Sequence, residues 1–171
     1  MKKILSLVLV VILTLSMSAC TEEFKDGVTS EIGVNIADGK VFGLNETAVT
    51  ENLKITAIAV EETNGIEYFE AAEGNVYVGV KFEIENISDE NQNISALLTF
   101  AASENDVMCE YSISGIMAFE GGGKTLDGTI APGKKLIGYY AVEVAEDWEE
   151  LEIQVQPDIL DETKVTFVLS K

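Results

Sequence analysis

Carboxylates are the most abundant side chains in this sequence that could do chemistry, and two short segments contain clusters of them. In the first, Asp89 and Glu90 follow Asn86 and precede Asn91 and Asn93. Carboxylate and amide oxygens suit Ca²⁺, which makes Asn86, Asp89 and Glu90 candidate calcium ligands. Their spacing lacks the regular ligand positions and the central glycine of an EF-hand loop. We therefore predict a solvated turn, in which polar side chains bond to nearby backbone groups, and no metal site.

The second acidic segment covers residues 146–150 and has Trp148 at its centre. It also lacks a spacing that would bring several oxygens onto one ion, so we interpret it as a solvated loop. The indole of Trp148 combines a large apolar surface with one N–H donor. We expect this ring to cover an open end of the fold rather than to contact a ligand.

Catalytic chemistry has little support in the composition. The chain contains no histidine, so the usual general base near neutral pH and the commonest zinc ligand are absent. Serines are plentiful, but no Ser-x-x-Lys spacing occurs. The 30 acidic residues always provide pairs that could act on a glycosidic bond, yet the single tryptophan offers few platforms for a sugar. We predict a protein that is not an enzyme and that uses no cofactor.

The segment Gly121-Gly122-Gly123-Lys124-Thr125 looks like the end of a phosphate-binding loop. The complete pattern requires glycine where this chain has Ala118, and Gly128 and Pro132 prevent the helix that would hold the phosphates. We interpret the segment as a hairpin loop and predict no nucleotide.

Cys20 is the strongest candidate for a chemical modification. Two lysines precede an apolar run over residues 4–15, and Met17-Ser18-Ala19-Cys20 follows, which is the layout of a secretory signal. The tetrad resembles the lipobox of bacterial lipoproteins, in which the cysteine becomes the lipidated first residue. The apolar run is shorter than the roughly 20 residues that a membrane span needs. We expect removal of residues 1–19 and lipid anchoring through Cys20 on the outer face of the cell membrane; an ordinary thiol near a generic cleavage site is the alternative.

The rest of the chain is strongly acidic. The net charge is −19, and removal of residues 1–19 takes away two lysines and no acid, which leaves −21. Such a surface repels nucleic-acid phosphates, so we predict no nucleic-acid partner. If Cys20 is acylated, Cys109 has no partner for a disulfide, and we expect it to be a buried, small apolar side chain.

The secondary-structure elements that carry these side chains are predicted from alternating apolar residues, which indicate β-strands. The clearest alternation covers residues 75–86, where Val76, Val78, Val80, Phe82 and Ile84 share one face of a half-buried strand. A second strand is predicted at residues 53–60, with Leu53, Ile55, Ala57 and Ala59 on one face. Other candidate strands cover residues 41–44, 94–101, 107–119, 135–144, 151–155 and 165–169.

Turn-forming residues separate these strands, among them Asn64-Gly65, Asn105-Asp106 and Pro132-Gly133. Pro132-Gly133 has the residue preference of a type II turn. No run of ten residues after the signal has the period of a helix. We therefore predict an all-β fold, an antiparallel immunoglobulin-like sandwich of about seven to eight strands at residues 40–171, preceded by a tether at residues 20–39.

Several segments resemble a known family, the Ig-like domain of unknown function numbered forty-three fifty-two, which is found in Gram-positive bacterial lipoproteins. The matching positions are Gly43 and residues 53–56, 60–61, 74–80, 85–90, 126–134 and 138–144, so the resemblance covers roughly residues 43–171. The resemblance implies a β-sandwich and a surface location, and it brings no catalytic residues.

We therefore expect a membrane-anchored extracytoplasmic lipoprotein, whose Ig-like domain is a binding or interaction module for a protein or another envelope component. A structural or protective envelope lipoprotein without a specific ligand is the alternative. In both cases we expect the protein to contact the membrane through the lipid on Cys20.

Overall fold

The computed structural model describes residues 40–119, 124–157 and 163–171. The predictions for the signal, Cys20 and the tether lie outside these residues, as does the glycine run 121–123.

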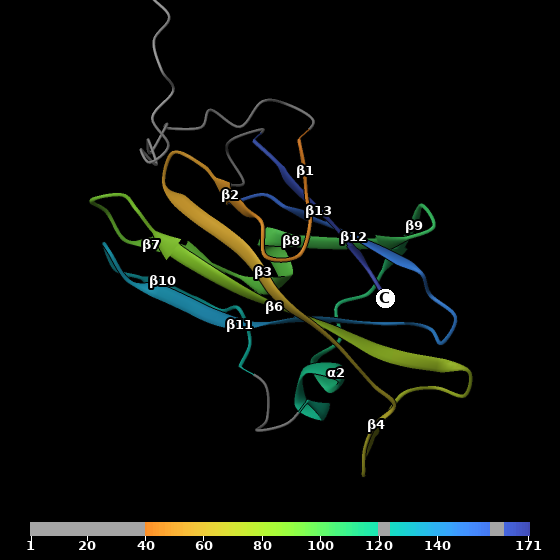
Figure 1. Ribbon diagram of the computed structural model, residues 1–171. Helices are drawn as coiled ribbons and strands as arrows, with labels where there is room; N and C mark the ends of the chain where they lie inside the picture. Colours follow the sequence, from red (N-terminus) through yellow and green to blue (C-terminus); the bar gives the residue numbers. More distant parts are fainter. Residues whose placement is uncertain (1–39, 120–123, 158–162) are drawn as a thin grey trace, which may run out of the picture. The chain divides into compact units, whose positions relative to one another are not determined.

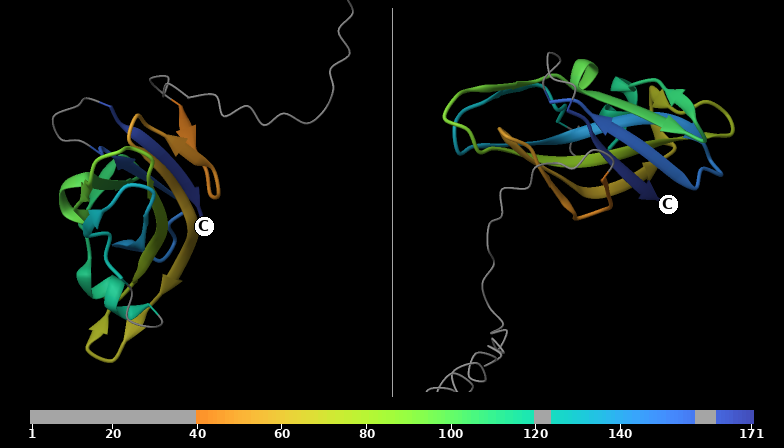
Figure 2. Two further views of the ribbon diagram at one scale, coloured as in Figure 1. Left: turned by 90° about the vertical axis from the view of Figure 1, so that its left-hand side faces the viewer. Right: turned by 90° about the horizontal axis from the view of Figure 1, so that it is seen from above.

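Two β-sheets pack face to face (Figure 1 and Figure 2). One has the strand order β1 (Val41–Phe42), β13 (Val165–Ser170), β12 (Glu150–Val155), β8 (Phe100–Glu104) and β9 (Val107–Cys109). The other has the order β11 (Lys135–Ala145), β6 (Asn75–Asn86), β3 (Leu53–Thr63) and β2 (Thr47–Val49). Neighbouring strands are antiparallel except β1 and β13, which are parallel. The predicted all-β sandwich is confirmed.

Four short strands and two short helices complete the described residues. β7 (Gln92–Ile94) pairs with β10 (Gly128–Ile130), and β4 (Gly65–Ile66) pairs with β5 (Phe69–Glu70). The helices are α1 (Ala96–Thr99) and α2 (Ile113–Ala118). The thirteen described strands exceed the predicted seven to eight because strands of two or three residues leave no periodic pattern.

Two predicted strands are wrong in part, because each contains one of the helices. Residues 94–101 divide into the end of β7, helix α1 and the start of β8. Residues 107–119 divide into β9 and helix α2. Ser112 caps α2 by accepting a hydrogen bond from the Gly115 N–H at 3.0 Å. A helix of six residues is too short to show its period above the surrounding apolar residues.

The main core lies between the two sheets. β6 contributes the side chains that the alternation predicted, and they pack against Phe100, Ile153 and Phe167 of the facing sheet. β3 departs from its predicted pattern, because the register shifts between Ala57 and Ala59. After this bulge Val60, rather than Ala59, packs against the core.

A second, smaller core covers part of the outer face of the four-stranded sheet. Helix α2 places Ile116 and Phe119 against Tyr77 of β6 and Tyr139 of β11. The predicted half-burial of β6 is therefore wrong at its first residues, because Tyr77 is buried from the second face. Gly79 is required there, since a Cβ atom would lie 2.3 Å from Cε2 of Phe119.

Candidate functional site

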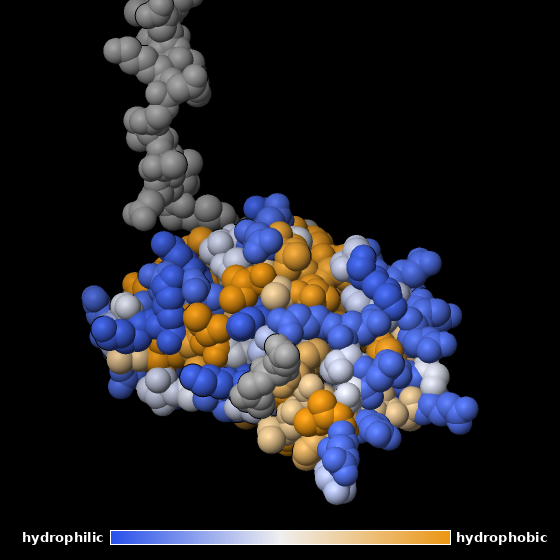
Figure 3. All heavy atoms as spheres, turned by 60° about the horizontal axis from the view of Figure 1, so that its bottom comes forward, coloured by the Kyte–Doolittle hydropathy of each residue, from blue (hydrophilic) through white to orange (hydrophobic). Residues whose placement is uncertain are grey.

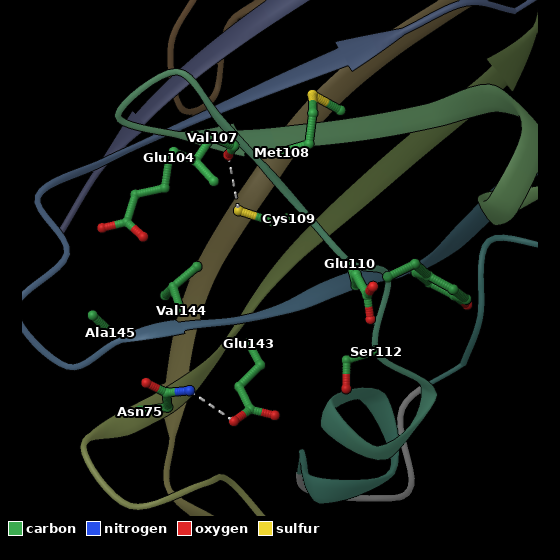
Figure 4. Close-up of a pocket in the computed structure, with 11 residues that line it drawn as sticks. Asn75, Glu104, Val107, Met108, Cys109, Glu110, Ser112, Glu143, Val144 and Ala145 are labelled. Atoms are coloured by element: carbon green, nitrogen blue, oxygen red, sulfur yellow. Dashed lines mark hydrogen bonds between the residues drawn. The ribbon is translucent and has the colours of Figure 1, made fainter.

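A cleft of about 470 Å³ opens between strands β9 and β11 (Figure 4). Each strand is the last of its sheet, so the cleft lies where the edges of the two sheets face each other. Its lining comes from β9 and the residues after it, from the end of β11, and from Asn75 at the start of β6: Asn75, Glu104, Val107, Met108, Cys109, Glu110, Tyr111, Ser112, Glu143, Val144 and Ala145.

A tight hairpin positions the β9 side of the cleft. β8 and β9 are joined by Asn105 and Asp106, whose φ angles of 49° and 64° are those of a type I′ turn. Asn and Asp tolerate this left-handed conformation better than other residues that have a Cβ. The turn predicted at these two residues is confirmed.

The chain then crosses from one sheet to the other and closes the inner wall of the cleft. Tyr111 forms an antiparallel bridge with Val142, and the Ser112 N–H donates to the Ala141 carbonyl at 2.7 Å. The Tyr111 ring stacks on Tyr140 with a centroid distance of 5.2 Å. Burial, followed by the nearby Cys109 and Tyr111, raises the pKa of Tyr140 to about 12. Tyr140 is therefore a neutral packing residue at physiological pH.

Three carboxylates surround the cleft, those of Glu104, Glu110 and Glu143 (Figure 4). Oε1 of Glu143 accepts hydrogen bonds from the Ala72 N–H at 2.9 Å and from Nδ2 of Asn75 at 3.0 Å. These bonds orient the carboxylate, which is only partly buried. Among the described residues, no group of three acidic or cysteine side chains could hold a metal ion.

Cys109 lies inside the cleft and is half-buried rather than buried as predicted. Its Sγ donates to the Val107 carbonyl at 3.7 Å. Burial raises the pKa of the thiol, and the negative charge of Glu104 raises it further. Because the thiolate is the nucleophilic form, Cys109 is suited to packing and ligand contact more than to nucleophilic chemistry.

Asn86 is a structural residue in the turn that was considered for calcium. Its Nδ2 donates to the carbonyls of Glu90 at 2.7 Å and Ile130 at 2.8 Å. Its Oδ1 accepts from both the N–H and the hydroxyl of Ser88. Asp89 and Glu90 are exposed. The hydrogen bonds of Asn86 therefore explain its place in the turn without a metal.

Pro132-Gly133 forms a turn in which the Lys134 N–H donates to the Ala131 carbonyl at 3.0 Å and Gly133 has φ 68°. These are the features of the predicted type II turn.

The glycine run at residues 121–123, for which the sequence predicts a hairpin loop, lies outside the described residues, so this interpretation stays a prediction. The run follows helix α2, and it precedes Thr125, which forms a parallel bridge with Tyr139.

A second feature of the surface is an apolar area on α2 and the β4–β5 hairpin. Ile66, Tyr68, Ile113 and Met117 are exposed here. Figure 3 shows apolar side chains gathered between hydrophilic bands at this end of the sandwich. Nothing in the described residues indicates what would cover this area.

The cleft itself was not predicted, because its walls come from segments that are far apart in the sequence. One signal was available in the sequence, where Val107 and Met108 are adjacent large apolar residues beside a polar turn. In the structure both side chains are exposed, at 68% and 66%.

None of the helices in the described residues is long and apolar enough to cross a membrane.

Comparison with known proteins identifies the fold. A family model described as "Domain of unknown function (DUF4352)" matches residues 42–165. No curated protein matches the sequence.

Three solved structures are similar to the described domain. The yjhA protein from Bacillus subtilis has a TM-score of 0.61 and 14% identity, over 76% of this chain and 100% of that one. A conserved hypothetical protein from Bacillus anthracis has a TM-score of 0.54 and 16% identity, over 74% and 95%. A protein from Bacillus subtilis described as "a putative lipoprotein (ycdA)" has a TM-score of 0.61 and 15% identity. That match covers 72% of this chain and only 38% of the ycdA chain. At these identities the likeness shows the fold alone.

Proposed function

The chain belongs to the family of the domain of unknown function DUF4352, and from this premise we propose that it is a lipid-anchored extracytoplasmic lipoprotein whose β-sandwich is a binding module. In this proposal residues 1–19 are the signal peptide, Cys20 carries the lipid, residues 20–39 are the tether and residues 40–171 are the domain.

Two observations support the anchoring. The N-terminal residues have the order of charge, apolar run, small residues and cysteine that a lipoprotein signal requires. One protein of similar fold is described as "a putative lipoprotein (ycdA)". Two or more acyl chains on one residue hold a protein on a membrane, whereas a single chain is marginal.

The observation that supports binding is the cleft between β9 and β11. Its rim carries two large apolar side chains, Val107 and Met108, that are mostly exposed to water. A concave site with apolar walls and a few polar groups is the usual form of a ligand site. Among the described residues no group of acidic or cysteine side chains could hold a metal ion, and the description of the matching family names no activity.

Metabolic labelling with an alkyne fatty acid tests the anchoring. We expect the wild-type protein to incorporate the label and the Cys20→Ala variant to lack it. Equal labelling of the two proteins would show that lipid is not attached at Cys20.

Site-directed photocrosslinking in cells tests the binding. A photoreactive amino acid replaces Met108 in the cleft or, as a control, the exposed Glu90 at the other end of β6. We expect a discrete adduct from position 108 and none from position 90. Absence of a discrete adduct at position 108 and at other positions around the domain would favour the envelope lipoprotein without a specific ligand.

A further inference from the structure

The cleft between β9 and β11 has the properties of a site for a positively charged, extended peptide. We propose that it binds a segment in which lysine or arginine alternates with apolar residues. This inference rests on the proposed binding function and names the partner's chemistry.

The charge of the cleft supports a cationic ligand. Glu104, Glu110 and Glu143 line it, and none of its described lining residues is basic. The ion pairs in the described residues involve Lys135 and Lys171, neither of which reaches these three carboxylates. Glu104 helps to raise the pKa of Cys109, which lies in the cleft, so the negative charge of this carboxylate acts inside the cleft.

The apolar walls support a peptide rather than a simple metal ion. Val107 and Met108 stand at the rim, and Val144 and Cys109 lie within the cleft (Figure 4). A small cation would leave these side chains in water. Side chains of an extended peptide point alternately to two sides, so the same segment can present charge to the carboxylates and apolar surface to Val107 and Met108.

The main chain of β9 supports an extended conformation of the ligand. β9 is the edge strand of its sheet. Glu104 and Val107 close the tight turn as a hydrogen-bonded pair, so the next pair, Ser103 and Met108, is the non-bonded type. The N–H and carbonyl of Met108 therefore point away from β8, where an added strand could pair with them.

A thiol inside the cleft gives a local measure of binding. The chain has two cysteines, so in the full-length Cys20→Ala variant Cys109 is the sole thiol. The probe is a fluorescent lysine–valine peptide of about six residues, which spans roughly 20 Å when extended. A glutamate–valine peptide is the control. Fluorescence anisotropy measures affinity, and the rate of Cys109 alkylation shows whether the cleft is covered.

Two variants of equal charge separate the cleft from general attraction to an acidic surface. Glu104→Gln with Glu110→Gln changes the cleft, while Asp89→Asn with Glu90→Gln changes exposed acids at the opposite end of β6. We expect the lysine–valine peptide to slow alkylation of Cys109. We also expect the cleft variant to weaken its binding about five-fold or more and the control variant by less than about two-fold.

Equal weakening by the two variants, binding without protection of Cys109, or no saturable binding would each overturn the proposal. The binding module itself is tested separately, because a crosslinked adduct at Met108 does not depend on this peptide. An adduct there, combined with failure of the lysine–valine peptide, would reject the cationic partner and retain the module.

Discussion

Nε1 of Trp148 donates a hydrogen bond of 2.8 Å to Oε2 of Glu62, and this bond joins the β11–β12 connection to strand β3. Lys171 lies 2.9 Å from the same Glu62 oxygen, and its Nζ donates to the Glu146 carbonyl at 2.7 Å. The indole is 2% exposed, so it closes this end of the main core, as the sequence predicted.

Removal of the Trp148 ring should strongly destabilise the domain. Truncation of a buried aromatic side chain costs about 3–5 kcal/mol, so we expect Trp148→Ala to lower the free energy of unfolding by about that amount. Urea denaturation measures the change. Leu97→Ala is the control, because Leu97 is 69% exposed and a surface change costs about 0.5 kcal/mol or less. Similar effects of the two variants would contradict the role given to Trp148.

Protonation of Glu62 should make the domain less stable in acid. The hydrogen bonds from Lys171 and Trp148 lower its pKa below the ordinary 4.5. A lowered pKa in the folded state gives stability that is complete above the unfolded value and is lost as the pH falls through the folded value. We expect Glu62→Gln to reduce the dependence of the unfolding midpoint on pH below about 4.5. The unfolding midpoints of the wild type and the variant are measured at a series of pH values. If both midpoints fall equally with pH below about 4.5, the stabilising effect of the Glu62 charge is refuted.

Gly79 should not accept a larger residue. A Cβ at this position meets the Phe119 ring, and overpacking of a core costs about 1–3 kcal/mol. We expect Gly79→Ala to show this loss in thermal unfolding and Phe119→Leu to restore part of it in the double variant. Gly43→Ala is the matched control, because the nearest atom to its Cβ is 4.0 Å away. No loss for Gly79→Ala would contradict the close packing of α2 on β6.

Asn86 should matter to stability much more than its neighbour Asp89. Asn86→Ala leaves the carbonyl of Ile130 without its side-chain donor, and an unsatisfied buried group costs about 1–3 kcal/mol. Asp89 is exposed, so Asp89→Ala should change the free energy of unfolding by about 0.5 kcal/mol or less. Chemical denaturation of both variants measures the difference, and equal losses would exclude the structural role of Asn86.

Salt should stabilise the domain, and calcium should add nothing specific. The net charge of −21 that remains after removal of residues 1–19 causes self-repulsion that salt screens over about 10 Å at 0.1 M. We expect NaCl to raise the melting temperature, and CaCl₂ to raise it no more than MgCl₂ at equal ionic strength. A calcium-specific increase that Asp89→Asn abolishes would instead make Asn86, Asp89 and Glu90 a metal site.

Sequence patterns predicted the parts of the fold whose cause is local. Alternate residues of β6, from Val76 to Ile84, face the main core because side chains of a strand alternate. The turns at Asn105-Asp106 and Pro132-Gly133 follow from the backbone preferences of those residues. Trp148 was expected at an open end because few exposed sites suit an indole. The presence of Glu62 and Lys171 beside it was not predictable, since both come from parts of the chain that are distant in sequence.

The sequence by itself determined the sandwich, its acidic surface and most long strands, because composition and a two-residue period depend only on neighbours in the chain. Only the tertiary structure decided that Tyr77 and Gly79 lie under α2, that Val60 replaces Ala59 after the bulge, and that β9 faces β11 across a cleft. Each of these depends on which edges and faces meet after folding. The packing of segments that are distant in sequence determines which edges and faces come into contact, and a local period carries no information about that packing.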